Sequence, residues 1–191
     1  ANIYYITFKR DRAENILNEV LDEDISPNLK IKSKLLLANI TGNSIKEALP
    51  ASVSGIEKNV LAELYFKYAL NCDEDCDIEN AVKYYKKCVE TSQDPNIYLS
   101  SALANLASVY DENGKSDLAV KYLQESLRLD ELKQNYNGIY VSSMKLAEIN
   151  SYKAPEKSLE YLKKAKACAV ELNETFYIAS SDVALGDFYY K

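Results

Sequence analysis

Apolar and small residues recur at helical spacing along most of this chain. The clearest stretch, ALANLASVYDENGKSDLAVKYLQESL at residues 102–127, carries one such stripe on each side of Asn113-Gly114. Positions three and four apart share a face of an α-helix, so each stripe predicts one amphipathic helix. Glycine readily adopts the left-handed conformation that ends helices, and Asn113-Gly114 therefore predicts the turn of a helical hairpin.

The same frame returns at regular intervals. A small residue preceded by leucine or tyrosine stands at Ala69, Ala107, Ala147 and Gly186. These positions are 38, 40 and 39 residues apart. A second small residue follows 11 or 12 positions later, on the next predicted helix, at Ala81, Ala119 and Ser158. Small side chains let two helix axes approach to about 8–10 Å, and each hairpin must then stack on a neighbour to bury its remaining apolar face. The period therefore predicts a helical repeat protein.

The residues of the frame resemble a known family. Leu103-x2-Leu106-Ala107-x2-Tyr110, followed by Ala119-x3-Leu123, resembles the tetratricopeptide repeat (TPR), with W-x2-L-G-x2-Y on one helix and A-x3-F on the next. The longer period is similar to that of kinesin light chains and bacterial peptide-sensing regulators, while the third unit departs in having Ser143 and Asn150 at aromatic positions. The resemblance covers residues 60–191. It implies an all-α fold, a right-handed superhelical solenoid of antiparallel helical hairpins.

The expected organisation follows from this frame. Residues 1–59 should form irregular hairpins of the same solenoid. Residues 60–191 should form about three and a half repeats, at roughly 60–94, 95–134, 136–173 and an incomplete 175–191. The predicted helices span about 2–9, 11–23, 27–41, 43–50, 54–72, 77–93, 95–113, 116–134, 136–151, 155–173 and 175–190.

Local signals mark several of these helix ends. Ser26-Pro27 and Asp94-Pro95 each place a capping oxygen before a proline suited to the first helical turn. Asn137-Gly138 is predicted to end a helix, as Asn113-Gly114 does. The terminal segments ANIYY and LGDFYYK leave apolar side chains uncovered in the array. We therefore expect either a fragment of a longer protein or a subunit whose ends are covered by other domains or a symmetry mate, since exposed ends of solenoids need a polar face.

Charge and composition narrow the function. With 23 basic and 29 acidic residues the formal charge is −6, and no cationic stripe would attract nucleic acid. No apolar run approaches the ~20 residues that span a bilayer, so no membrane partner is expected. The four cysteines follow no secreted spacing, which favours a reducing compartment and a cytoplasmic location, with a signal removed ahead of Ala1 left open.

Catalytic signatures are missing from the sequence. The chain has no histidine, which removes the commonest general base and the usual partner of serine and cysteine nucleophiles. Its five glycines form no phosphate-binding loop. We therefore predict a non-enzymatic protein that needs no cofactor.

The acidic stretch CDEDCDIEN at residues 72–80 allows two interpretations. Asp73, Asp75 and Asp77 have the first spacings of a calcium loop, but Ile78 stands where that loop needs glycine. Cys72 and Cys76 would need two more ligands to hold zinc. The favoured interpretation is a solvated turn in which Asp77 caps the next helix, with no metal site; weak cation binding is the alternative. Two further cysteines, Cys88 and Cys168, are expected to be packing residues.

The resemblance also implies a binding surface on the first helix of each hairpin. Transferred to this chain, the peptide or partner groove comprises Glu63, Phe66, Lys67, Leu70, Ser101, Ala104, Asn105, Ser108, Asp111, Val141, Met144, Lys145, Glu148, Ser180, Val183 and Asp187. The surface combines apolar residues, an asparagine and carboxylates, and it lacks the Lys/Asn/Arg clamp with which some family members hold a terminal carboxylate. It predicts a protein or peptide ligand with apolar anchors and basic flanks.

Three roles fit such a chain. The first is a peptide-binding scaffold with apolar contacts from Phe66, Leu70, Ala104, Val141 and Met144, and with Asn105 bonding the peptide backbone. The second is a sensor module of a longer signalling or transcription-regulating protein. The third is a structural module that forms a homo-oligomer through its uncovered terminal helix.

Overall fold

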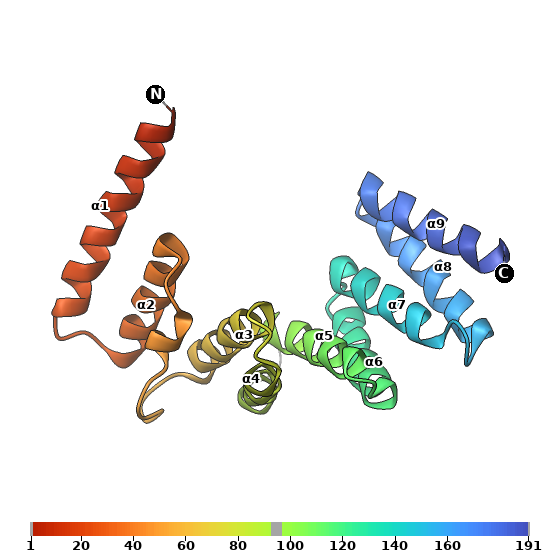
Figure 1. Cartoon of the computed structure of the whole chain (residues 1–191), viewed down its shortest axis with the longest axis horizontal. Helices are drawn as coiled ribbons and strands as arrows, with labels where there is room; N and C mark the ends of the chain where they lie inside the picture. The colour runs from red at the N-terminus through yellow and green to blue at the C-terminus, as the bar shows by residue number, and fades with distance from the viewer. Residues whose placement is uncertain (1, 93–96, 191) are drawn as a thin grey trace. The chain divides into compact units, whose positions relative to one another are not determined.

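The computed structural model describes residues 2–92 and 97–190, and the side chains of 9–92 and 98–190. The described residues form nine α-helices and one 3-10 helix and contain no strand (Figure 1). The fold is therefore an all-α repeat fold, as the sequence predicts. The chain divides into two compact units, residues 1–98 (the first unit) and 99–191 (the second unit).

The first unit pairs its helices in sequence order. Its elements are α1 (Asn2–Asp22), α2 (Pro27–Thr41), η1 (Ile45–Ala48), α3 (Lys58–Glu74) and α4 (Ile78–Thr91). One apolar cluster joins α2, η1 and α3 and includes Ile31, Leu35 and Leu64. Between α3 and α4, the small residues Ala69 and Ala81 are both fully buried, as close packing of two helices requires.

Three predictions for the first unit are wrong in their boundaries. The helices predicted at 2–9 and 11–23 form one helix, α1, because no glycine or proline interrupts the stretch. The helix predicted at 43–50 is only the short η1, which follows the left-handed Gly42 and ends before Pro50. The helix predicted from residue 54 begins at Lys58, since Gly55 has φ +75°.

The second unit contains most of α5 (Ile97–Glu112) and all of α6 (Ser116–Leu132), α7 (Tyr136–Asn150), α8 (Pro155–Glu171) and α9 (Thr175–Tyr190). The frame residues Ala107, Ala119, Ala147 and Ser158 are all buried. The Ser158 hydroxyl donates to the Ala147 carbonyl at 2.7 Å, which fixes α8 against α7. The small residues thus lie where the two helices of a hairpin approach each other.

Buried serines fix the spacing of α5, α6 and α7. The Ser142 hydroxyl donates to Ser126 Oγ at 3.2 Å, and the Ser126 hydroxyl donates to the Ser100 carbonyl at 2.8 Å. All three serines are buried. Because buried hydroxyls need partners, this chain of hydrogen bonds sets how α7 lies against the preceding hairpin.

One type of turn ends four of the helices. In each, a residue in the left-handed region is followed by an N–H that donates to the carbonyl five positions earlier, the Schellman arrangement. The left-handed residues are Cys76, Gly114, Gln134 and Asn173. Gly114, with φ +72°, confirms the turn predicted at Asn113-Gly114.

The other predicted helix ends give mixed results. Ser26 caps α2 through its hydroxyl, which confirms the start predicted there. Asp94-Pro95 lies outside the described residues. The stop predicted at Asn137-Gly138 is wrong: Gln134 takes the left-handed conformation, and Gly138 lies in the first turn of α7.

Gly138 is required by a close approach rather than by a turn. A Cβ added there would lie 2.2 Å from Oδ2 of Asp130, a buried carboxylate that accepts a hydrogen bond from Asn135 Nδ2 at 2.8 Å. At Gly186, on α9, an added Cβ would meet no atom within 4 Å. A side chain would therefore be crowded at Gly138 and would have free space at Gly186.

Gly138→Ala is expected to lower the free energy of unfolding by about 1–2 kcal/mol, since the clash with Asp130 outweighs the gain in helix propensity. Gly186→Ala, with free space around it, should raise that free energy by up to about 1 kcal/mol. Urea denaturation of both variants measures the difference. Equal effects of the two substitutions would contradict the close approach of Gly138 to Asp130.

None of the helices within the described residues combines the length and the apolar character needed to cross a bilayer.

Candidate functional site

The predicted groove residues of the second unit lie on α5, α7 and α9. Figure 1 shows α7 and α9 running in the same direction, with α8 as the returning helix between them. Ala104 is buried. The half-buried residues are Asn105, Ser108, Asp111, Val141, Met144, Lys145 and Ser180, and the exposed ones are Ser101, Glu148, Val183 and Asp187. Two surface hollows bring several of these residues together.

A pocket of about 500 Å³ lies between α7, α8 and α9, and we call it the α7–α9 pocket. Four of the predicted groove residues line it: Met144, Lys145, Glu148 and Asp187. The other lining residues are Ala147, Ser151, Pro155, Ser158, Leu162, Ala184 and Phe188. This volume falls within the about 300–1,000 Å³ typical of ligand sites.

The α7–α9 pocket lies beyond a contact between the beginnings of α7 and α9. Near their beginnings, the rings of Tyr140 and Tyr177 stack with centroids 4.2 Å apart. Farther along, the facing positions carry the small residues Ala147, Ser151 and Ala184. Small side chains cannot fill the space between the helices, so the pocket remains open there.

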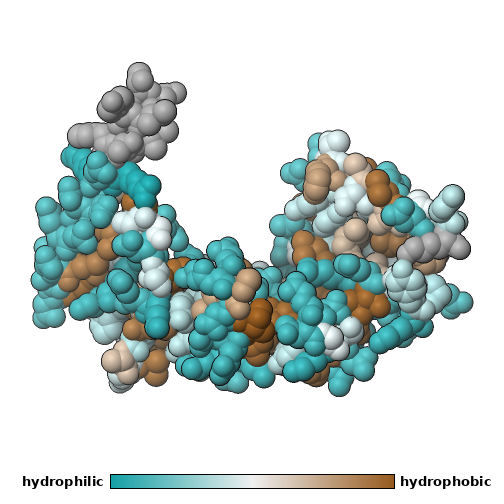
Figure 2. Space-filling model, in the orientation of Figure 1, coloured by the Kyte–Doolittle hydropathy of each residue, from teal (hydrophilic) through white to brown (hydrophobic). Residues whose placement is uncertain are grey.

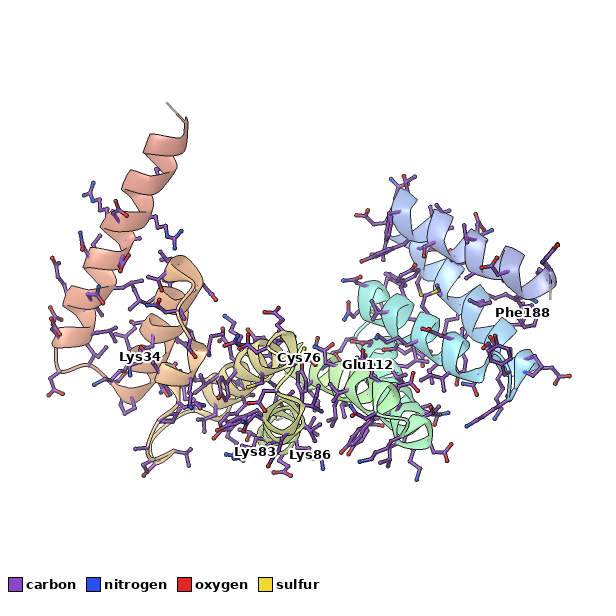
Figure 3. The ribbon with its side chains drawn as sticks, in the orientation of Figure 1. Lys34, Cys76, Lys83, Lys86, Glu112 and Phe188 are labelled. Atoms are coloured by element: carbon purple, nitrogen blue, oxygen red, sulfur yellow. The ribbon has the colours of Figure 1, made fainter. Side chains whose placement is uncertain are left out.

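The pocket has an apolar floor and an aromatic wall. Ala147 and Leu162 are buried beneath it, and Met144 is half-buried at its side. Phe188 comes off the side of α9 that faces the turn between α7 and α8 (Figure 3). Figure 2 shows pale and brown residues gathered over this region of the chain.

A smaller hollow of about 140 Å³ lies between α5, α6 and α7 and shares Lys145 and Glu148 with the α7–α9 pocket. We call it the α5–α7 hollow; its other lining residues are Ala107, Ser108, Asp111, Glu112, Leu123 and Ile149. Lys145 Nζ donates to Ser108 Oγ at 2.5 Å, so the lysine bridges α7 to α5. Two neighbouring hollows thus share one wall on α7.

Carboxylates dominate the charge around the two hollows. Asp111, Glu112, Glu148 and Asp187 line one or both of them, against the single ammonium of Lys145. Figure 3 labels Glu112 at the end of α5. Asp111 also accepts a hydrogen bond from the Ser116 hydroxyl at 2.6 Å. The resulting field favours a cationic group on any ligand that binds there.

The remaining predicted groove residues of the second unit line neither hollow. Ser101, Ala104 and Asn105 lie nearer the start of α5, and Val141 lies toward the start of α7. On α9, Val183 is 65% exposed, next to the pocket residue Ala184.

In the first unit, the predicted groove residues engage one another and their neighbours. Lys67 pairs with Glu63 at 3.0 Å. Phe66 lies between the rings of Tyr85 and Tyr98, with centroids 6.2 and 5.4 Å away. The pKa of Tyr98 is raised mainly because the side chain is buried. The negative charge of Glu63 and its hydrogen bond with Tyr98 raise this pKa further. Leu70 is half-buried on the same helix.

The sequence frame missed the part of the α7–α9 pocket that comes from α8 and its turn. Pro155, Ser158 and Leu162 lie on a second helix, whereas the transferred groove positions cover first helices only. The 11-residue gap between Ala147 and Ser158, one shorter than in the other hairpins, is the signal that marks this turn as different.

The acidic stretch at residues 72–80 spans the turn between α3 and α4, and its three aspartates accept hydrogen bonds from nearby side chains. Asp77 accepts hydrogen bonds from the Asn80 side chain and backbone N–H, which lower the pKa of Asp77 and confirm the predicted cap. Asp73 accepts from the Tyr85 hydroxyl at 3.3 Å, and Asp75 accepts from Asn71 Nδ2 at 3.2 Å. Within the described residues, no group of three metal-ligating side chains comes together.

The buried cysteines behave as packing residues. Cys88 and Cys168 are both buried in second helices, as predicted. Burial raises the pKa of the Cys88 thiol to about 11. A thiol held in its neutral form is a poor nucleophile, so nothing at Cys88 suggests chemistry.

Comparison with known families identifies the repeat. Residues 62–95 and 100–131 match the family model described as tetratricopeptide repeat. These two segments are TPR-like repeats. The two matched segments are the hairpins α3–α4 and α5–α6, which carry the small-residue frame.

Solved structures of other proteins resemble most of the chain in fold. BtubC (BKLC) from P. vanneervenii has a TM-score of 0.75 at 15% identity, covering 99% of this chain and 86% of that one. MamA has a TM-score of 0.62 at 16% identity, covering 88% and 93%. A putative kinesin light chain from Podosopora anserina, with nearly identical TPR-like repeats, has a TM-score of 0.57 at 13% identity, covering 89% of this chain and 90% of that one. Such identities establish the fold alone. Comparison of the sequence with curated proteins gave no match.

Proposed function

We propose that this TPR-like chain is a non-enzymatic scaffold that binds a protein or peptide on the face formed by α5, α7 and α9. The observation that carries the proposal is the pair of hollows on this face, which share Lys145 and Glu148. A row of hollows along parallel helices suits a peptide whose successive side chains enter separate hollows. The free thiols of all four cysteines support a reducing, cytoplasmic location.

The predicted groove residues form one patch on each unit. Val141 and Met144 provide apolar contacts on the second unit, to which the buried Ala104 adds little area, and Asn105 hydrogen-bonds the backbone of the ligand. The first unit presents its own patch, in which Phe66 and Leu70 are the apolar contacts. Lys67 is paired with Glu63, so this patch offers no single uncompensated charge.

The double variant Asn105→Ala, Met144→Glu tests the proposal. Peptides are first selected from a random display library on the purified chain, and their affinities are then measured by fluorescence anisotropy. We expect the variant to bind at least about 30-fold more weakly, because truncating central contacts has effects of this size. Helix content should be unchanged.

A matched control changes the same residue types away from the groove. Asn137 and Leu132 are both exposed and line neither hollow. The variant Asn137→Ala, Leu132→Glu should keep the affinity of the parent chain. A library that yields no peptide, or a groove variant that binds as well as the control, would rule out the groove.

A second candidate role, oligomerisation, is favoured by the exposed apolar face of α9. Phe176, Val183 and Tyr190 are 75%, 65% and 95% exposed and lie seven positions apart, hence on one side of the helix. Several exposed apolar side chains on one side of a helix favour a contact site there. We expect the chain to self-associate in light scattering and Val183→Glu to shift it toward monomer. A parent chain that stays monomeric at high concentration would exclude this role.

A further inference from the structure

We propose that the α7–α9 pocket is an anchor site for an aromatic side chain of a peptide, held beside a lysine or arginine of the same peptide. The proposal rests on the function proposed above and adds the chemistry of the ligand to it. It also assigns a role to Leu162, Ala184 and Phe188, which are not among the predicted groove residues.

The apolar part of the pocket suits an aromatic ring. Its floor is made by the buried side chains of Ala147 and Leu162, which have no charge to satisfy. Its sides bring the thioether of Met144 and the ring of Phe188 to the same space. Sulfur–aromatic and aromatic–aromatic contacts are each favourable beyond simple burial, so a ring gains more here than an aliphatic group.

The carboxylates of the pocket suit a cationic neighbour of that ring. Glu148 and Asp187 are both exposed and belong to different helices, α7 and α9. The Lys145 ammonium is held by Ser108 on α5, away from α9. An acidic peptide would meet like charges at Glu148 and Asp187, whereas a basic peptide would meet opposite ones, and such complementarity decides between competing ligands.

Three short fluorescent peptides in a glycine–serine background test the proposal with the full chain. The first has a central tryptophan flanked by lysines, the second has alanine in place of tryptophan, and the third has glutamates in place of the lysines. We expect the alanine and glutamate peptides to bind at least about tenfold more weakly than the first.

One variant locates the binding in the pocket. Ala184 is half-buried at the pocket wall, so Ala184→Phe fills the empty space from within. This variant should weaken the tryptophan–lysine peptide about tenfold and leave the alanine–lysine peptide unchanged. Circular dichroism and urea denaturation verify that the variant is folded.

Charge reversal tests the basic preference. Asp187→Lys should reduce or reverse the preference for the lysine peptide over the glutamate peptide. Glu160→Lys makes the same change at an exposed position of α8 that lines neither hollow, and it should leave the preference as it is.

The outcomes of these experiments distinguish the anchor-site proposal from the broader proposal of a peptide-binding scaffold. Equal affinities for tryptophan and alanine peptides, a preference for the glutamate peptide, or no effect of Ala184→Phe would overturn the anchor site. So would a failure of the tryptophan–lysine peptide to bind while library-selected peptides bind the α5–α7–α9 face. In each case the scaffold function would stand. Failure of the library itself would reject the scaffold function.

Discussion

Tyr85→Ala is expected to lower the free energy of unfolding of the first unit by about 3–5 kcal/mol, the range found when a fully buried aromatic side chain is deleted. Tyr85 lies on α4 with 0% of its side chain exposed and contacts the ring of Phe66. Its removal would leave a cavity between α3 and α4 that the surrounding side chains fill only in part. Urea denaturation, followed by circular dichroism, measures the loss.

Tyr85→Phe is the control for this prediction. It keeps the ring and removes the hydroxyl that donates to Asp73, so its cost should be about 0.5–1.5 kcal/mol. A Tyr85→Ala variant that loses no more than Tyr85→Phe would contradict the burial of the ring.

Leu146→Ala is expected to cost the second unit about 2–5 kcal/mol. Leu146 is fully buried on α7, next to the frame residue Ala147, and α7 packs against both α6 and α8. Deleting its side chain removes packing at the point where neighbouring hairpins meet. Because repeat arrays are stabilised by contacts between neighbours, the loss should reach both hairpins of the second unit.

Hydrogen exchange resolves where this loss occurs. In Leu146→Ala, amides of α6, α7 and α8 should all exchange faster than in the parent chain. Leu132→Ala, at a leucine that is 68% exposed, should change the free energy of unfolding by less than about 0.5 kcal/mol. Similar costs for the two leucines would refute the repeat core.

The helical hairpins could be predicted from the sequence because their signal is repeated. A small residue next to leucine or tyrosine returns at Ala69, Ala107 and Ala147, and all three are buried against a second helix. Irregular segments carried no such signal. The break predicted between the helices at 2–9 and 11–23 does not exist, since no glycine or proline interrupts α1.

The residues that adopt the left-handed conformation at most helix ends could not be predicted, for a stereochemical reason. Of the five left-handed residues that end helices, Gly42 and Gly114 adopt this conformation without strain, and Asn173 is of a type that tolerates it. Cys76 and Gln134 adopt it because the packed helices on either side impose it, at a cost of about 1–2 kcal/mol that no local pattern reveals. The glycine at Gly138, which looked like a turn, serves close packing instead.

The candidate site was predictable in its first-helix residues only. Met144, Lys145, Glu148 and Asp187 were named from the repeat frame, and the structure brings them to one pocket. The contribution of Leu162 and Phe188 depends on how α8 and α9 pack against α7, which the repeat frame does not specify.

The methyl resonance of Met144 provides the most direct test that the α5–α7–α9 face binds a ligand. Met144 is the sole methionine of the sequence and lines the α7–α9 pocket, so a chain labelled with 13C-methyl methionine gives one signal from the proposed site. On titration with a library-selected peptide, we expect this signal to shift and to saturate with the affinity measured by anisotropy. A peptide that binds while the Met144 signal stays in place would contradict it.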